Sequence, residues 1–176
     1  MQTLKLTVLF ATVSLLISSY KPVDKGPVTK WLSLEQVAEN AVKEKRPILI
    51  DLYTDWCGWC GVMDRKTYGN KKVAEYLASK FYAVKIDAEM LKPITWQNKT
   101  YRFNTAYKTH DFAMYLTSGN LSYPTTVIIP PDGSGPQAIP GYMTPKEFEV
   151  ILKYFGEGRY VNTSFDKYHK SFKSSW

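Results

Sequence analysis

Cysteine and histidine are scarce in this sequence, with two residues of each type among 176. A structural zinc site needs four ligands, and no second cysteine pair is present to complete one. A disulfide-stapled miniature scaffold needs more cysteines, whereas a chain of this length can bury a core without staples. With 44% hydrophobic and 22% charged residues, the composition is that of a globular protein, not a disordered one. The sequence therefore predicts one folded domain without a bound metal or other cofactor.

A concentrated block of positive charge is also missing. The net charge is +7, but lysines and arginines alternate with acidic residues, apart from a mildly basic C-terminal tail. Proteins that bind nucleic acids gather their positive charge on a recognisable module. We therefore expect a solvated basic surface and no nucleic-acid partner.

The N-terminal region has no apolar run long enough to cross a bilayer comfortably. Leu6–Ile17 is a mostly apolar stretch of 12 residues behind Lys5. This is the length of the apolar region of a signal peptide. We predict a signal peptide over residues 1–19, with an uncleaved membrane tether as the alternative, and a polar linker over residues 20–30. The processed protein is then exported and has no stable membrane insertion.

Hydrophobic spacing and turn residues predict an alternating order of helices and strands. The predicted elements are helix 33–45, strand 48–53, helices 57–67 and 72–80, strand 81–87, a long connection, strand 124–130, edge strand 137–140 and helix 144–155. Strands that alternate first with helices and then form a hairpin indicate an α/β domain with a mixed sheet covered on both faces. We place this domain at residues 31–158.

Two residues separate Cys57 from Cys60, at the point where strand 48–53 passes into a helix. A bridge between them closes a very small loop and contributes little to stability. A thiolate at a helix start is stabilised by free backbone N–H groups and the helix dipole, which makes Cys57 acidic and nucleophilic. Cys60 follows one turn later and is close enough to displace a partner from Cys57. The pair predicts disulfide exchange; half of a zinc site completed by histidines is the less favoured alternative.

Several separated features resemble the thioredoxin superfamily. Trp56 before the first cysteine, the pair Cys57 and Cys60, and Asp51 in the preceding strand match that family's pattern. The segment 123–125 (Tyr-Pro-Thr), at the head of a strand, resembles the family's cis-proline loop.

The resemblance covers about residues 33–156, and residues 84–87 resemble the strand that crosses beside the proline loop. It implies a thioredoxin-like α/β fold with a mixed central sheet, helices on both faces and an insertion at about residues 90–121. The stretches TDWCGWCGVMD and LSYPTTVIIP resemble exported thioredoxin-like proteins of Bacteroidetes-type bacteria.

Asp51 interrupts an apolar strand. A carboxyl group placed there loses hydration, which raises its pKa toward neutrality, so that it can accept the proton of Cys60 during resolution of a mixed disulfide. Strand parity does not fix its face, so an exposed Asp51 on an edge strand is the alternative. In many thioredoxins a lysine of the neighbouring strand partners this acid. Counting back from Asp87 places Ala83 at that position, with Lys85 two residues on.

The resemblance also implies a substrate groove beside the cysteines. In this family a cis proline, here Pro124, faces the cysteine pair, and the backbone of the preceding residue, here Tyr123, pairs with the substrate like an added strand. An ordinary trans proline that opens a strand is the alternative. Trp59 stands where a typical thioredoxin has proline. Trp56 and Trp59 together could form a stacking surface for unfolded substrate, or Trp59 could fill a packing gap.

Residues 88–123 form a longer connection than thioredoxin needs, and they contain many aromatic side chains. Lys99–Phe103 predicts a small ribbon and His110–Thr117 a helix. The connection either forms a private packing layer or borders the groove near Pro124 and selects partners, two hypotheses that the sequence leaves equal.

The tail over residues 159–176 carries aromatic residues at helical spacing after Ser164, which predicts a short helix docked on the domain. Neither His110 nor His169 has a visible catalytic partner, and we interpret both as structural residues.

Together these features predict a thiol–disulfide oxidoreductase of the periplasm or cell envelope that exchanges disulfides with protein thiols. We expect it to work in the reducing or isomerising direction, with a membrane-linked electron donor. The alternatives are a binding module of the same fold with idle cysteines, and a metal-handling protein that uses both thiolates.

Overall fold

The computed structural model describes residues 28–176. The predicted signal peptide at residues 1–19, and all but the last three residues of the predicted linker at 20–30, lie outside this range. Thr29 is buried, and its hydroxyl donates a hydrogen bond to the carbonyl of Tyr68 at 2.7 Å. The packed region therefore already includes Thr29, two residues before the predicted start of the domain. Within the described residues, no helix has the length and apolar character needed to span a membrane.

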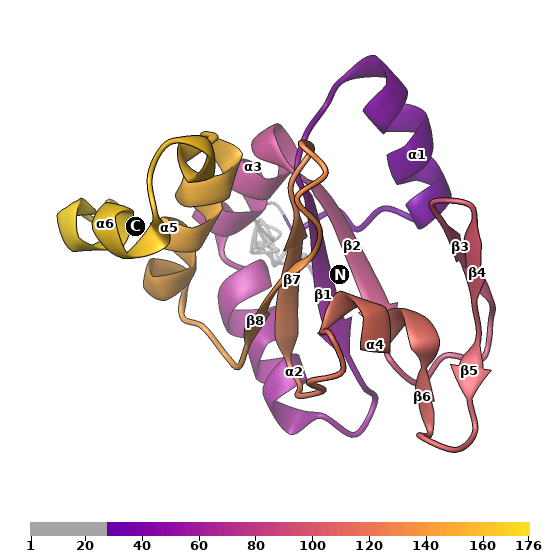
Figure 1. The fold of residues 1–176 in the computed structure, drawn as a ribbon. Helices are drawn as coiled ribbons and strands as arrows, with labels where there is room; N and C mark the ends of the chain where they lie inside the picture. Colours follow the sequence, from indigo (N-terminus) through magenta and orange to yellow (C-terminus); the bar gives the residue numbers. More distant parts are fainter. Residues whose placement is uncertain (1–27) are drawn as a thin grey trace, which may run out of the picture.

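A four-stranded mixed sheet forms the centre of the protein (Figure 1). Its spatial order is β2-β1-β7-β8, in which β1 and β2 are parallel and the remaining neighbours are antiparallel. The strands are β1 (Ile48–Tyr53), β2 (Tyr82–Asp87), β7 (Thr125–Ile129) and β8 (Gln137–Pro140). This arrangement confirms the predicted α/β class and mixed sheet.

Helices lie on both faces of this sheet (Figure 1). The helices of the described structure are α1 (Leu34–Lys43), α2 (Gly58–Met63), α3 (Lys71–Lys80), α4 (Asp111–Leu116), α5 (Pro145–Gly156) and α6 (Phe165–Ser171), of which α6 packs on α5. A π-helical turn, η1 (Asp64–Tyr68), follows α2, and a 3-10 turn, η2 (Arg159–Val161), follows α5. Alternation along β1 divides the core: Ile48, Ile50 and Leu52 pack with α1 and α4, whereas Leu49 packs with α2, α3 and α5.

Local sequence explains where the helices begin. Ser33 and Thr144 each form a capping box, with Gln36 and Glu147 respectively, and Pro145 occupies the first helical position of α5. Apolar residues at helical spacing then bury one side of each helix against the sheet. Both helices begin within one residue of their predicted starts at 33 and 144.

The predicted insertion folds into two small ribbons and a helix. The first ribbon pairs β3 (Ile94–Trp96) with β4 (Lys99–Tyr101), and the second pairs β5 (Phe103–Asn104) with β6 (Thr109–His110). Tyr101 of β4 and Phe112 of α4 (Asp111–Leu116) are buried in the core, with ring centroids 5.2 Å apart. The insertion is therefore a packing layer for the face of the sheet that α1 and α4 cover.

The tail folds back on α5. Tyr154 on α5 packs against Phe165 and Tyr168 of α6, with ring centroids 5.2 and 5.4 Å apart. Ser164 occupies the N-cap position of α6, although its side chain makes no capping hydrogen bond.

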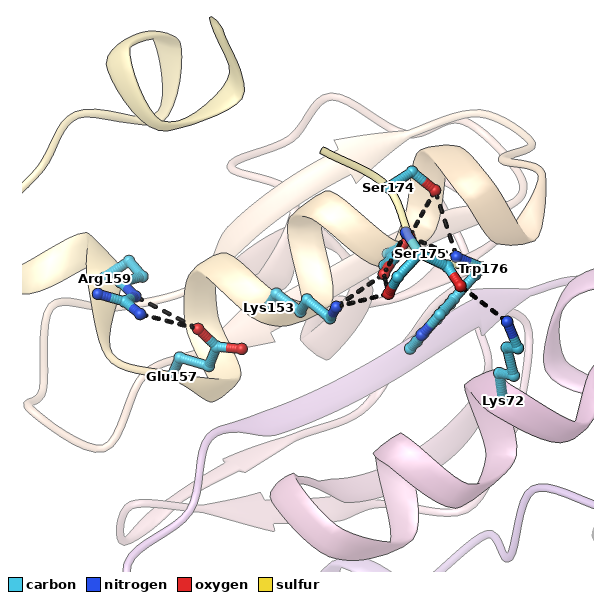
Figure 2. A network of polar contacts seen from close by, with 8 residues as sticks. Lys72, Lys153, Glu157, Arg159, Ser174, Ser175 and Trp176 are labelled. Carbon is cyan, nitrogen blue, oxygen red and sulfur yellow. Dashed lines mark hydrogen bonds and ion pairs between the residues drawn. The ribbon is translucent and has the colours of Figure 1, made fainter. Parts of the chain in front are cut away.

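The last residues of the chain gather around Glu149, whose side chain is fully buried. Figure 2 shows Ser174, Ser175 and Trp176 beside Lys153. The hydroxyls of Ser174 and Ser175 each donate to this carboxylate at 2.6 Å, and Lys153 pairs with it at 2.7 Å. Burial alone raises the pKa of Glu149, but these hydrogen bonds outweigh it and lower the pKa to about 2. The tail is thus fastened by charge-assisted hydrogen bonds as well as by its rings.

Candidate functional site

Cys57 and Cys60 form a disulfide at the start of α2. Cys57 is the N-cap residue, and its sulfur accepts a hydrogen bond from the backbone N–H of Cys60 at 3.1 Å. Cys57 is partly exposed, whereas Cys60 is 4% exposed. One sulfur is therefore accessible to another molecule and the other is sheltered behind it, which is the asymmetry that dithiol exchange requires.

Asp51 is buried at the centre of β1, which rules out the exposed edge-strand alternative. The predicted partner position is wrong: parallel pairing sets Asp51 opposite Lys85, and Ala83 lies opposite Leu49. The ammonium of Lys85 lies 2.5 Å from Asp51 Oδ2. Counting from Asp87 failed because the register of two parallel strands depends on how the intervening helices pack, which the strand sequences do not encode.

The environment of Asp51 brings the pKa of its carboxyl group close to neutral pH. Burial raises the pKa and is the largest effect, and the nearby Lys85 cation opposes it. The resulting pKa is about 6, compared with an ordinary value of 3.8. A group with this pKa can both accept and release a proton near neutral pH.

Asp51 and Cys60 belong to the same layer of the molecule. Strand alternation puts Asp51 on the face of β1 that carries Leu49, and Leu49 packs in one cluster with Met63 of α2. Cys60 and Met63 are the two buried residues of α2 and are three positions apart, so both face the sheet. The buried carboxyl and the buried cysteine therefore lie between the same strand and helix.

The Tyr123–Pro124 peptide bond is cis, as the resemblance implies. The alternative of an ordinary trans proline that opens a strand is therefore wrong. Tyr123 packs edge-to-face on Trp56, with ring centroids 5.8 Å apart. The indole of Trp56 donates a hydrogen bond to Glu89 Oε1 at 2.9 Å, yet the side chain stays 67% exposed. The proline loop and the residue before Cys57 thus form one connected surface.

The insertion and the residue directly before it contact this surface. Glu89 lies directly before the predicted insertion, and Thr109 within it contacts the phenol of Tyr123. Burial raises the pKa of Tyr123, Thr109 opposes the rise, and Glu89 adds to it. Part of the insertion therefore lies against Tyr123 of the proline loop, and selection of partners by the insertion stays a prediction.

Trp59 is 62% exposed, so the interpretation that it fills a packing gap is wrong. Its ring lies 5.4 Å from that of Tyr142, which follows β8. Two aromatic pairs therefore lie near the disulfide, each made of an exposed tryptophan and a half-buried tyrosine: Trp56 with Tyr123, and Trp59 with Tyr142.

The histidines take no part in this arrangement. His110 is buried and caps α4, where its Nδ1 accepts from the N–H of Phe112 at 3.1 Å. His169 is exposed and stacks on Phe165. Residues 28–176 hold no group of three or more histidine, cysteine or acidic side chains placed to bind a metal ion.

Three residues around the site have no place in the sequence prediction, namely Asp64, Glu89 and Tyr142, and Lys85 appears in it only as two residues beyond the predicted partner of Asp51. Lys85 carried a usable signal, because it is the one cation of the predicted strand 81–87 and a buried Asp51 needs a cationic or hydrogen-bonding partner. The others carried none, since each meets its partner through the packing of separate elements.

Comparison with solved structures gives the same fold. A protein described as DsbH oxidoreductase superposes with a TM-score of 0.54 at 13% identity, covering 80% of this chain and 92% of that chain. A thioredoxin-fold protein from Helicobacter pylori also gives 0.54, at 18% identity, covering 72% of this chain and 79% of that one. The fold is therefore thioredoxin-like, as the sequence resemblance implies.

Among curated proteins, spermatogenesis-associated protein 20 of Homo sapiens is 33% identical over 75 residues, which is 43% of this chain and 9% of that protein. This chain thus matches about a tenth of the length of such relatives. A family model described as Thioredox_DsbH, protein of unknown function, DUF255, matches residues 15–155. On that match, together with the fold and the cysteine pair, the chain belongs to the thioredoxin-like DsbH family.

Proposed function

We propose that this protein is a thiol–disulfide oxidoreductase that exchanges disulfides with protein substrates through Cys57 and Cys60. The observation that carries the proposal is the placement of this disulfide at the start of α2, with Cys57 accessible and Cys60 sheltered. Membership of the DsbH family and the cis Tyr123–Pro124 bond support it.

In the dithiol form, the Cys57 thiolate attacks one sulfur of a substrate disulfide, and the other substrate sulfur leaves as a thiolate. The Cys60 thiol then gives its proton to Asp51 and attacks the Cys57 sulfur. The substrate sulfur that was bound to Cys57 then leaves with the electron pair of the broken S–S bond and takes up a proton. Two electrons pass to the substrate, and the protein returns to the disulfide form.

Substrate binding is assigned to the exposed surface beside the disulfide. The Tyr123 backbone at the cis proline offers strand-like hydrogen bonding, and Trp56 and Trp59 offer rings that an unfolded chain can pack against. Apolar contact of this kind suits partly folded protein chains, whose side chains are still accessible.

The proposed direction is reducing or isomerising, and the proposed location is the periplasm or cell envelope. An oxidising compartment would otherwise keep the cysteine pair in its disulfide form. A membrane-linked electron donor that returns two electrons to Cys57 and Cys60 is therefore part of the proposal.

Reduction of insulin by the full chain, with dithiothreitol as reductant, tests the proposal. We expect turnover with the parent protein and none above background with Cys57→Ser, while Cys60→Ser accumulates a mixed disulfide with insulin. Equal rates with the parent and Cys57→Ser would overturn it. Retained binding of reduced, unfolded protein by an inactive parent would instead favour the binding module with idle cysteines.

A further inference from the structure

Lys85 contacts two carboxylates at once. Its ammonium lies 2.5 Å from Asp51 Oδ2 and 2.6 Å from Asp64 Oδ1. The three side chains differ in exposure: Asp51 is 2% exposed, Lys85 21% and Asp64 39%. A single cation therefore links a buried acid to one that is open to solvent.

Asp64 is also tied to the cysteine helix. It follows Met63 at the end of α2, and its backbone N–H donates to the carbonyl of Cys60. The carboxylate that shares Lys85 with Asp51 is thus fixed one turn after the resolving cysteine.

Aromatic rings hold the ammonium of Lys85 in place. It lies 4.5 Å from the ring centre of Tyr53 and 5.4 Å from that of Trp31. Such contacts favour a cation and restrict where it can move. Lys85 therefore has little freedom to leave either carboxylate for the other.

The other titratable groups that face this cluster are phenols and acids. Tyr68 lies beside Asp51, with its hydroxyl 3.1 Å from Thr126 Oγ1. Burial raises the pKa of Tyr53, and the negative charges of Asp87 and Asp55 raise it further. Apart from Lys85, the titratable groups that act on Asp51 in the described structure are thus carboxylates or phenols.

We propose that Asp64 is a positioning residue which, by sharing Lys85, keeps the buried Asp51 basic enough to accept the Cys60 proton near neutral pH. The inference rests on the proposed disulfide exchange. A cation devoted to one carboxylate strongly favours its ionised form, whereas a second carboxylate on the same cation cancels part of that effect. Asp64 also repels negative charge on Asp51, which acts in the same direction.

The geometry leaves one oxygen of Asp51 for the proton. Lys85 occupies Oδ2, while Oδ1 is buried and has no hydrogen-bond partner among residues 28–176. When the S–H bond of Cys60 breaks, its proton goes to Asp51. Its electron pair forms the S–S bond with Cys57, and the substrate sulfur leaves with the pair of the bond that breaks.

The test separates this resolution step from the first attack. Full-chain dithiol protein is mixed with one equivalent of Ellman's reagent, which forms a mixed disulfide on Cys57 and then releases a second thionitrobenzoate when Cys60 attacks. The rate of the second release is followed from about pH 4, at which Asp51 is protonated, to about pH 9, at which Asp51 is ionised. Asp51→Asn identifies the part of the pH profile that belongs to Asp51.

Asp64→Asn should move the midpoint of this profile to lower pH by about one pH unit and slow the plateau, because Asp51 becomes a weaker base. Lys85→Gln should move the midpoint the opposite way, to higher pH. Asp64→Glu, which keeps the charge, is the matched control and should leave the midpoint near that of the parent.

An unchanged midpoint in Asp64→Asn, in protein whose circular dichroism matches the parent, would overturn the assignment, because it would leave Asp64 a purely structural role. A shift in the same direction for Asp64→Asn and Lys85→Gln would also overturn it. Failure of the proposed function is distinguishable: the parent itself would then show no Cys60-dependent second release.

Discussion

Replacing Asp51 by Asn should change how the stability of the disulfide form depends on pH. Folding raises the pKa of Asp51 from 3.8 to about 6, mainly because burial penalises its charge. A carboxyl group with a raised pKa stabilises the fold while it is protonated. Its contribution is fully present below pH 3.8, the unfolded value, and is lost as the pH rises through about 6.

The size of this contribution follows from the gap between the two pKa values. A gap of roughly two pH units, at about 1.4 kcal/mol per unit, corresponds to about 3 kcal/mol. The free energy of unfolding of the parent should lose about this amount between about pH 4 and about pH 7 from Asp51 alone. Asp51→Asn lacks the titrating group, so its stability relative to the parent should rise by the same amount.

Urea unfolding followed by far-ultraviolet circular dichroism measures the effect. The parent, Asp51→Asn and the exposed control Glu39→Gln are compared at several pH values, all as the disulfide form. The control should follow the parent. Parallel curves for the parent and Asp51→Asn over the whole range would refute the reasoning, since the carboxyl of Asp51 would then titrate alike in the folded and unfolded chain.

Three further changes test other parts of the structure. Glu149→Gln removes a carboxylate whose pKa folding lowers from 4.5 to about 2. This carboxylate contributes roughly 3 kcal/mol to the free energy of unfolding above pH 4.5, and the contribution is lost as the pH falls through about 2. The loss of stability of Glu149→Gln relative to the parent, measured by urea unfolding, should therefore shrink as the pH falls from 4.5 to about 2. Trp59→Ala should alter the free energy of unfolding by no more than about 0.5 kcal/mol, yet raise the KM for a peptide disulfide several-fold in steady-state assays. Phe112→Ala should cost about 3–5 kcal/mol in urea unfolding, whereas Tyr107→Ala, at an exposed position of the insertion, should cost less than about 0.5 kcal/mol.

The sequence predicts the framework well because local rules determine it. Gln137–Pro140 forms the edge strand with the predicted bounds, and α5 begins at Pro145 after its cap Thr144, within one residue of the predicted start. The predicted helix at residues 57–67 is less accurate: α2 begins at Gly58, and from Asp64 onward the turn is π-helical. Cys57 is therefore the cap of the helix, and its sulfur accepts a hydrogen bond from the backbone N–H of Cys60.

Interactions between distant segments could not be predicted from the sequence. Asp51 was singled out by its place in an apolar strand, but its partner Lys85 required the register of two parallel strands separated by three helical segments. Glu149 looks like a surface acid within a helix, and its burial depends on Ser174 and Ser175, which lie 25 and 26 residues later. Such pairings are fixed by tertiary packing, which outweighs local propensity.

Disulfide exchange by this protein depends most directly on a stabilised thiolate at Cys57. The ultraviolet absorbance of the thiolate, measured against pH for the reduced Cys60→Ser variant, tests this in one titration, with Cys57→Ser as the matched control. Cys57 should ionise well below the ordinary thiol value of about 8.5, because the backbone N–H of Cys60 at the helix start donates to its sulfur. Ionisation at the ordinary value, with no reaction toward a disulfide, would contradict it.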